Sequence, residues 1–187
     1  MSGWRTRLVN SLALTQDIPE SRFFQLATQS PDGQLHNRTV VFRGLDETQD
    51  VLYLVTDTRS QKCLDFQCNR KAAVCWYFAH SREQYRFSVT GEVCTVHSHE
   101  SLCSHYWAQL SESAKSQFFW GEPGSARNNP EYPLKIVTPS TQIPPSHFAV
   151  IKLTVQNADY LSLTGNPQIR ERFELQNGQW ICQPILP

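Results

Sequence analysis

Residues 23–42, FFQLATQSPDGQLHNRTVVF, carry the clearest structural signal in the chain. Two strand-like runs, 23–28 and 35–42, lie on either side of the tripeptide PDG at 31–33. Proline and aspartate favour a turn at such a position, and glycine permits a positive φ angle there. The stretch therefore predicts a β-hairpin.

Short strands continue along the rest of the chain. They are predicted at 51–55, 72–78, 85–96, 148–155, 160–163, 172–175 and 180–185. The dipeptide Asn177-Gly178 separates the last two and is preferred in two-residue hairpin turns. Gly91, inside a predicted strand, indicates a bulge or a barrel bend. The spacing of apolar residues predicts helices at 3–14, 60–69 and 98–119.

Strands that follow one another without alternating helices predict a mainly β fold with a few helices. A closed or nearly closed antiparallel barrel fits best, because closure removes exposed sheet edges. The length of 187 residues and the absence of an internal repeat predict a single domain over 1–187. Residues 121–147 contain six prolines and no sustained period, so we expect a long loop that is functional or mobile.

Composition excludes several classes of function. Lys plus Arg and Asp plus Glu each number 17, so the formal net charge is zero. A nucleic-acid-binding protein usually carries a basic excess, and no such partner is expected here. Charged and polar residues interrupt the apolar positions near the N-terminus, so we expect no signal peptide. No run of 18 apolar residues occurs, so we expect no membrane-spanning helix. The expected location is the cytoplasm.

The six cysteines are expected to be reduced and mostly structural. No pair has the C-x-x-C spacing of a redox or zinc site. His97 and His99 lie near Cys94 and Cys103, but their spacing matches no closed zinc pattern. A helix cap is the expected role of this segment, and the sequence predicts no metal site.

Three basic segments are candidates for anion binding. Arg38 and Arg43 bracket an apolar strand, and residues 56–62, TDTRSQK, occupy a predicted strand-to-helix junction. The third segment is Arg-Glu-Arg at 170–172. Hydroxyls, a lysine and the first amides of a helix are groups that bind phosphate. Taken singly, each segment also fits a solvated strand end or an ordinary helix cap.

The order of the segments is more specific than any one of them. NRTVVFRG at 37–44 is followed by a T-x-x-x-S-x-K pattern at 56–62, and Arg-x-Arg at 170–172 precedes a Trp-bearing hairpin. This set resembles the pyridoxamine 5'-phosphate oxidase family, and within it the oxidase-related FMN-binding proteins. The resemblance covers the chain from about residue 22 to 187. It implies an FMN-binding split β-barrel and a homodimer with FMN at the subunit interface.

The resemblance also implies which residues contact the ligands. The implied FMN contacts are Arg38, Thr39, Val40, Val41, Val55, Thr56, Ser60, Gln61, Lys62, Arg86, Ser125 and Arg172. The implied substrate contacts are Arg43 and Arg170. No catalytic residue is assigned.

The chain departs from the oxidase at several of these positions. Gln61 stands where the oxidase has arginine, and Arg86 where it has a flavin-contacting glutamine. On the substrate side, Arg43 replaces a lysine, which keeps the charge and changes the donor geometry. The family's Arg-x-His becomes Gln-Ile-Arg at 168–170 and lacks the histidine. Substrate positions thus differ more than cofactor positions.

Three functions follow as hypotheses. The first is an FMN-dependent oxidoreductase that acts on an unidentified small molecule. The second is oxidation of pyridoxamine or pyridoxine 5'-phosphate itself. The third is a split barrel without catalysis that carries flavin or another ligand such as haem.

Overall fold

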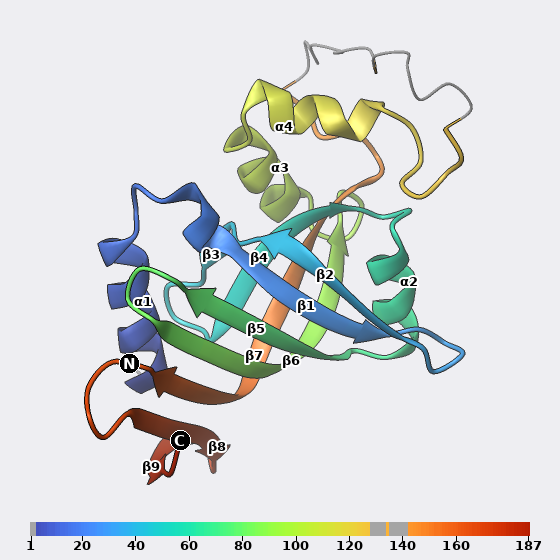
Figure 1. Cartoon of the computed structure of the whole chain (residues 1–187). Coiled ribbons are helices and arrows are strands. Elements are labelled where there is room, and N and C mark those ends of the chain that lie inside the picture. Colours follow the sequence, from blue (N-terminus) through green and yellow to red (C-terminus); the bar gives the residue numbers. More distant parts are fainter. Residues whose placement is uncertain (1–2, 128–133, 135–141) are drawn as a thin grey trace.

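The computed structural model describes residues 3–127, 134 and 142–187, so part of the predicted loop at 121–147 lies outside the described residues. In this part of the chain, nine strands form one antiparallel sheet (Figure 1). The strands are β1 Phe23–Gln29, β2 Leu35–Val41, β3 Gly44–Leu45, β4 Val51–Asp57, β5 Lys71–Phe78, β6 Glu83–Thr95, β7 Phe148–Ser162, β8 Ile169–Gln176 and β9 Gln179–Ile185. The helices are α1 Gly3–Leu14, α2 Gln61–Cys68, α3 Glu100–Ala108 and α4 Glu112–Ser116, with 3-10 turns at Pro19–Arg22 and Gln117–Phe119.

The sheet curls into a barrel whose order is β2-β1-β5-β6-β7-β4-β3. β2 also lies against β4, which brings the two ends of the sheet together. β7 is long enough to pair with β4 near its start and with β8 near its end, while β6 pairs along nearly its whole length. The predicted mainly β, antiparallel fold is confirmed.

Two hydrophobic cores hold the barrel and its helices. The first fills the barrel and includes Leu52 and Leu54 from β4. The second lies on the other face of β4, where Val51 and Tyr53 pack with α3 residues such as Trp107. Because successive side chains of a strand point to opposite faces, β4 is buried on both sides.

Helix α1 covers one end of the barrel with its apolar face (Figure 1). Trp4 and Leu8 are fully buried in the first core. Arg7 donates two hydrogen bonds of 2.8 Å to Glu171 on β8, and its guanidinium lies 4.5 Å from the centre of the Tyr160 ring. These contacts tie the N-terminal helix to the C-terminal hairpin.

Two predicted boundaries are wrong for identifiable reasons. The helix predicted at 98–119 breaks after Ala108, because Ser111 accepts a hydrogen bond from the backbone of Ala114 and begins α4. The strands predicted at 148–155 and 160–163 are one strand, β7. Its polar middle was taken for a break, yet Asn157 and Asp159 pair with both β6 and β8.

The structure also tests the predictions for the cysteines and tryptophans. All six cysteines are free. Trp107 is fully buried in the second core, and Trp180 packs against the first.

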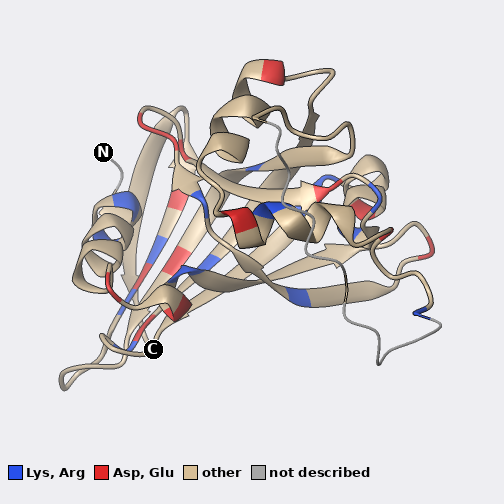
Figure 2. Cartoon of the chain, turned by 90° about the horizontal axis from the view of Figure 1, so that it is seen from above, with Lys and Arg blue, Asp and Glu red and all other residues tan. Residues whose placement is uncertain are grey.

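Within the described residues, no helix has the length and apolarity to cross a membrane. Basic and acidic positions are interspersed along the strands (Figure 2).

Of the two roles predicted for Gly91, the bulge is wrong. The register shift between β6 and β7 falls at Ser88 and Val89, so Gly91 is not the bulge. Instead, the ring of Phe66 from α2 packs on the Gly91 backbone, and a Cβ atom there would lie 2.2 Å from a ring carbon. The missing side chain is what lets α2 approach β6.

Gly91→Ala should therefore destabilise the protein. Overpacking of a filled core costs typically 1–3 kcal/mol, and we expect a loss of about that size in the free energy of unfolding measured with urea. The cost should shrink in a Phe66→Leu background, because the clashing ring is then gone. Equal costs in both backgrounds would show that the Phe66 contact is not the reason for glycine.

Candidate cofactor site

A pocket of about 380 Å³ opens between the end of β2 and the end of β4. We call it the β2–β4 pocket. Strands β2 and β4, the start of α2, and the α3–α4 region all contribute to its lining. The predicted ligand residues that line it are Thr39, Val40, Val41, Arg43, Val55, Thr56, Ser60 and Lys62.

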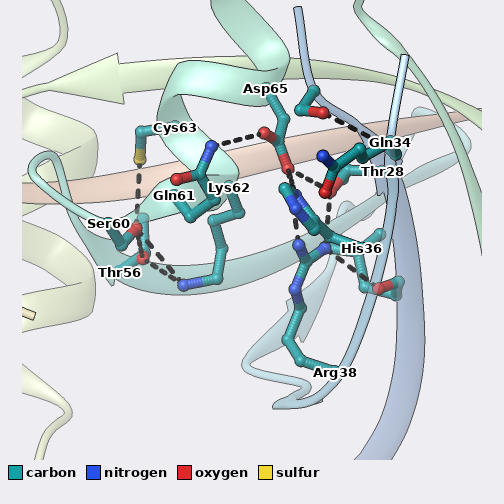
Figure 3. Close-up of polar contacts among 12 residues, drawn as sticks. Thr28, Gln34, His36, Arg38, Thr56, Ser60, Gln61, Lys62, Cys63 and Asp65 are labelled. Atoms are coloured by element: carbon teal, nitrogen blue, oxygen red, sulfur yellow. Dashed lines mark hydrogen bonds and ion pairs between the residues drawn. The ribbon is translucent and has the colours of Figure 1, made fainter. Parts of the chain in front are cut away.

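A cluster of three polar side chains lies at one end of this pocket. The Lys62 ammonium donates hydrogen bonds of 3.0 Å to Thr56 Oγ1 and 3.3 Å to Ser60 Oγ (Figure 3). The two hydroxyls lie 3.0 Å apart. Ser60 occupies the N-cap position of α2, but its side chain caps no backbone amide. The simple helix-cap interpretation of Ser60 is therefore wrong.

The two positively charged residues of the pocket, Lys62 and Arg43, are partly buried. Burial lowers the pKa of Lys62 below its usual value. Arg43 lines the same pocket, and among the described residues its buried Nε has no hydrogen-bond partner. Burial, with the nearby charge of Arg22, lowers the pKa of Arg43 as well. A buried cationic donor without a partner is costly, and the charge of an anion in the pocket would offset part of that cost.

The rest of the pocket is apolar. Val41 and Val55 line it from the barrel side, and Leu110 and Phe118 from the helical side. β2 ends the path of the described sheet, so one backbone edge of this strand has no ladder partner. Apolar walls beside free backbone donors and acceptors suit a flat heteroaromatic ring with polar edges. Together with the cationic end, these features fit the phosphate and the ring of FMN.

Arg38 and Gln61 lie beside the pocket and do not line it. Arg38 Nη1 donates to the Leu26 carbonyl at 3.1 Å and to Thr28 Oγ1 at 2.7 Å. Its Nη2 lies 3.4 Å from a carboxylate oxygen of Asp65, and Gln61 Nε2 donates to the other oxygen at 3.0 Å (Figure 3). Both predicted FMN contacts are thus directed to one carboxylate.

Asp65 was not identified from the sequence. It is fully buried and accepts hydrogen bonds from Thr28 and Gln61, and its Oδ2 lies 3.2 Å from the His36 ring nitrogen. Burial opposes its ionisation, but these contacts outweigh burial and lower the pKa of Asp65. Its position four residues after Gln61 on α2 was the available signal, because such residues meet on a helix.

The remaining predicted arginines line a second pocket of about 490 Å³ on the outer face of the sheet. We call it the arginine pocket, after Arg86, Arg170 and Arg172. Asp159 accepts a 2.7 Å bond from Arg86 and two bonds, of 3.1 and 2.9 Å, from Arg170. Burial opposes ionisation of Asp159, but the bonds from the two arginines lower its pKa. Asp159 too was missed from the sequence.

Strand register fixes the separation between the two sets. Thr39, on β2, begins a row of directly paired residues that crosses β1, β5, β6 and β7 and ends at Arg172 on β8. Adjacent strands lie about 4.8 Å apart, so the five steps span roughly 24 Å along the sheet. This path follows a curved sheet, so it is an upper limit on the straight-line separation. The arginine pocket itself extends along the row to Gln25 on β1 and Asn37 on β2, close to Thr39 of the β2–β4 pocket.

Ser125 lines neither pocket. It is exposed, and its hydroxyl donates to the Glu122 carbonyl at 2.7 Å. The nearby Pro123 lines the β2–β4 pocket instead.

Comparisons with known proteins identify the family of this chain. Residues 1–96 match the family model described as pyridoxamine 5'-phosphate oxidase, FMN-binding domain. A pyridoxamine 5'-phosphate oxidase-related, FMN binding protein from Nostoc punctiforme is 32% identical in sequence. Its structure superposes with a TM-score of 0.93 over 100% of this chain and 99% of that chain.

Two further relatives are informative. Pyridoxine/pyridoxamine 5'-phosphate oxidase 2 of Arabidopsis thaliana is 28% identical over 170 residues, which cover 89% of this chain and 86% of that protein. PhzG from Burkholderia lata, solved with tetrahydrophenazine-1-carboxylic acid, is 18% identical and superposes with a TM-score of 0.85 over 100% of this chain and 94% of that chain. This last likeness shows the fold alone. The family match over half of the chain and the 32% identity to the Nostoc protein lead to one conclusion: this chain belongs to the FMN-binding domain family of pyridoxamine 5'-phosphate oxidases.

Proposed function

We propose that this protein binds FMN and is an FMN-dependent oxidoreductase that acts on a small molecule. One observation carries the proposal: Lys62, Ser60 and Thr56 converge in a pocket that also holds the unpartnered Nε of Arg43. A phosphate satisfies the lysine and the two hydroxyls, and Arg43, which the resemblance assigns to the substrate, adds positive charge to the same pocket. Bound FMN would supply two-electron oxidation or reduction of the substrate.

Each part of the pocket has a task in this proposal. Lys62 and Ser60 hold the cofactor phosphate by charge-assisted hydrogen bonds. Val41 and Val55 pack on the ring, and the free backbone edge of β2 binds its polar atoms. Asp65 keeps Arg38 beside the phosphate end, where its positive charge acts on the phosphate without direct contact. Leu110 and Phe118 exclude water from the ring.

We also propose that the complete site is formed by two copies of this chain. The arginine pocket contains Arg86 and Arg172, which the family resemblance assigns to the cofactor, and Arg170, which it assigns to the substrate. Five strand steps, roughly 24 Å along the curved sheet, separate Thr39 from Arg172, so we expect the two sets to meet on one ligand only when they come from different chains. A homodimer in which each arginine pocket faces the partner's β2–β4 pocket resolves this separation.

A second candidate is oxidation of pyridoxamine or pyridoxine 5'-phosphate. It is supported by the 28% identity to the Arabidopsis oxidase over 89% of this chain. Against it stand Arg43 in place of a lysine and Arg170 in place of the family's histidine. A third candidate, a carrier of flavin or haem without catalysis, has no specific observation in its favour.

The first prediction concerns Lys62. Lys62→Ala should weaken FMN binding by about 10- to 150-fold, because a hydrogen bond to a charged group contributes about 1.5–3 kcal/mol. The measurement is titration of the apo-protein with FMN, followed by quenching of flavin fluorescence. The matched control is Lys71→Ala, an exposed lysine at the start of β5.

Unchanged FMN affinity in Lys62→Ala would show that the phosphate lies elsewhere. A wild-type protein that is colourless when purified and does not bind added FMN would overturn the proposal as a whole.

The second prediction tests the shared site by complementation. Lys62→Ala damages the β2–β4 pocket, and Arg172→Ala damages the arginine pocket. In a mixed dimer of the two variants, one site carries both changes and the other carries neither. Co-expressed chains with two affinity tags should therefore bind one FMN per mixed dimer with wild-type affinity. If both pockets of a single chain served one site, each site would keep one defect and no such binding would be observed.

The third prediction separates the two enzymatic candidates. With pyridoxamine 5'-phosphate and oxygen, we expect much slower formation of pyridoxal 5'-phosphate than by the Arabidopsis relative assayed in parallel. The reason is the altered donor set at Arg43 and Arg170. The product is measured by its absorbance after reaction with a hydrazine. A rate equal to that of the relative would make this chain a pyridoxamine 5'-phosphate oxidase in function as well as in family.

A further inference from the structure

The end of β6 and the start of α3 bring a carboxylate, a thiol and an imidazole together at the edge of the second core, to which Cys94 belongs. Among the described residues, Glu92, Cys94 and His99 form such a group, and their ligand atoms all lie within 4.8 Å of one another. Glu92 and Cys94 are two residues apart on one strand and so share a face. His99 follows a tight turn that reverses the chain.

Hydrogen bonds hold this turn in one shape. The Thr95 amide donates to Ser98 Oγ at 3.0 Å, and the Ser98 amide donates to Thr95 Oγ1 at 3.2 Å. The His99 amide donates to the Thr95 carbonyl at 2.8 Å. The backbone of His99 is therefore placed over the end of β6 before any ligand binds.

The His99 ring is oriented as in a metal ligand. Its Nδ1 lies 3.0 Å from Ser98 Oγ, which leaves Nε2 facing Glu92 Oε1 at 3.9 Å. This distance is too long for a hydrogen bond. Metal-bound histidines commonly use the other ring nitrogen in this way, to bond a nearby oxygen that fixes the ring. The predicted helix cap is wrong here, since the His99 side chain caps no amide of α3.

Glu92 and Cys94 are also supported from outside. Lys152, directly opposite on β7, places its ammonium 3.6 Å from Glu92 Oε2, so Oε1 stays on the side of His99. Cys94 is fully buried, and the Cys103 thiol donates to its backbone carbonyl at 3.3 Å. Both residues thus have their positions fixed by neighbours that are not themselves in the group.

We infer that Glu92, Cys94 and His99 form a binding site for a borderline divalent cation, with Zn²⁺ as the best fit. Zn²⁺ takes thiolate, imidazole and carboxylate together, whereas Mg²⁺ and Ca²⁺ prefer oxygen ligands alone. Zinc bonds of about 2.0–2.3 Å place ligand atoms roughly 3.3–3.8 Å apart in a tetrahedron. The group closes by about 1 Å to reach that geometry. Sγ of Cys94 binds the ion as its proton passes to solvent, and water takes the fourth position.

The sequence predicted no metal site because the spacing of these residues matches no closed zinc pattern. A strand pair at i and i+2 followed by one histidine is not among those patterns. Only the turn at 95–98 brings the histidine over the strand, and the sequence spacing does not reveal that fold. The site is separate from the β2–β4 pocket and does not depend on FMN.

The test uses the full-length, reduced protein. Competition with a chromophoric chelator measures Zn²⁺ affinity, and substitution with Co²⁺ reports the ligands through a thiolate-to-metal charge-transfer band. We expect one bound ion per chain, and a Co²⁺ band that is lost in Cys94→Ala. Cys68 and Cys182 are exposed thiols, so a band that persists in Cys94→Ala would belong to them and would overturn the site.

His99→Gln gives the decisive comparison, because His99 lies at the surface of the fold and its loss leaves the core intact. Loss of an outer-shell partner alone costs 10- to 100-fold in metal affinity, so loss of this ligand should cost at least about 100-fold. The matched control is His97→Gln, an exposed histidine on the same turn. Thermal unfolding without metal checks that both variants fold. Absence of binding in the wild type, or equal losses in both variants, would refute the inference.

Discussion

The pairing of β6 with β7 is the constraint on which the rest of the molecule depends. Each strand is longer than the others, and each therefore serves two parts of the fold. The first half of β7 pairs with β4 and supports the β2–β4 pocket. The second half pairs with β8 and presents Asp159 between Arg86 and Arg172. The register shift at Ser88 and Val89 lies where these halves meet.

Burial on both faces of β4 explains how a small barrel carries a ligand site at its edge. The first core holds the inner face, and α3 covers the outer face through the second core. Strand β4 is rigid for this reason, and its end delivers Val55 and Thr56 to the pocket. Gly91 contributes because its backbone leaves room for the Phe66 ring. Phe66 and Lys62 both belong to α2, so this contact fixes the position of Lys62. Packing remote from the pocket thus sets the position of its charged end.

Charge is managed differently in the two pockets. In the arginine pocket, Asp159 neutralises part of the positive charge and holds two arginines in place. Beside the β2–β4 pocket, Asp65 binds Arg38, while the Nε of the pocket residue Arg43 has no partner among the described residues. The second pocket is therefore the one that an anion completes most directly. Its cationic end suits the anionic part of an amphiphilic ligand, and its apolar walls suit the ring of the same ligand.

Most strands, the hairpin turns, the family and most of the β2–β4 pocket could be predicted from the sequence. They follow from local periodicity and from a motif within about 25 residues. The sequence did not determine that Arg38 and Gln61 are directed to Asp65, or that polar Asn157 and Asp159 continue a strand. Nor did it place His99 over Cys94. Such contacts depend on strand register and on the direction of a turn, which arise only when distant segments pack together. Tertiary structure alone decided which of the candidate side chains share a pocket.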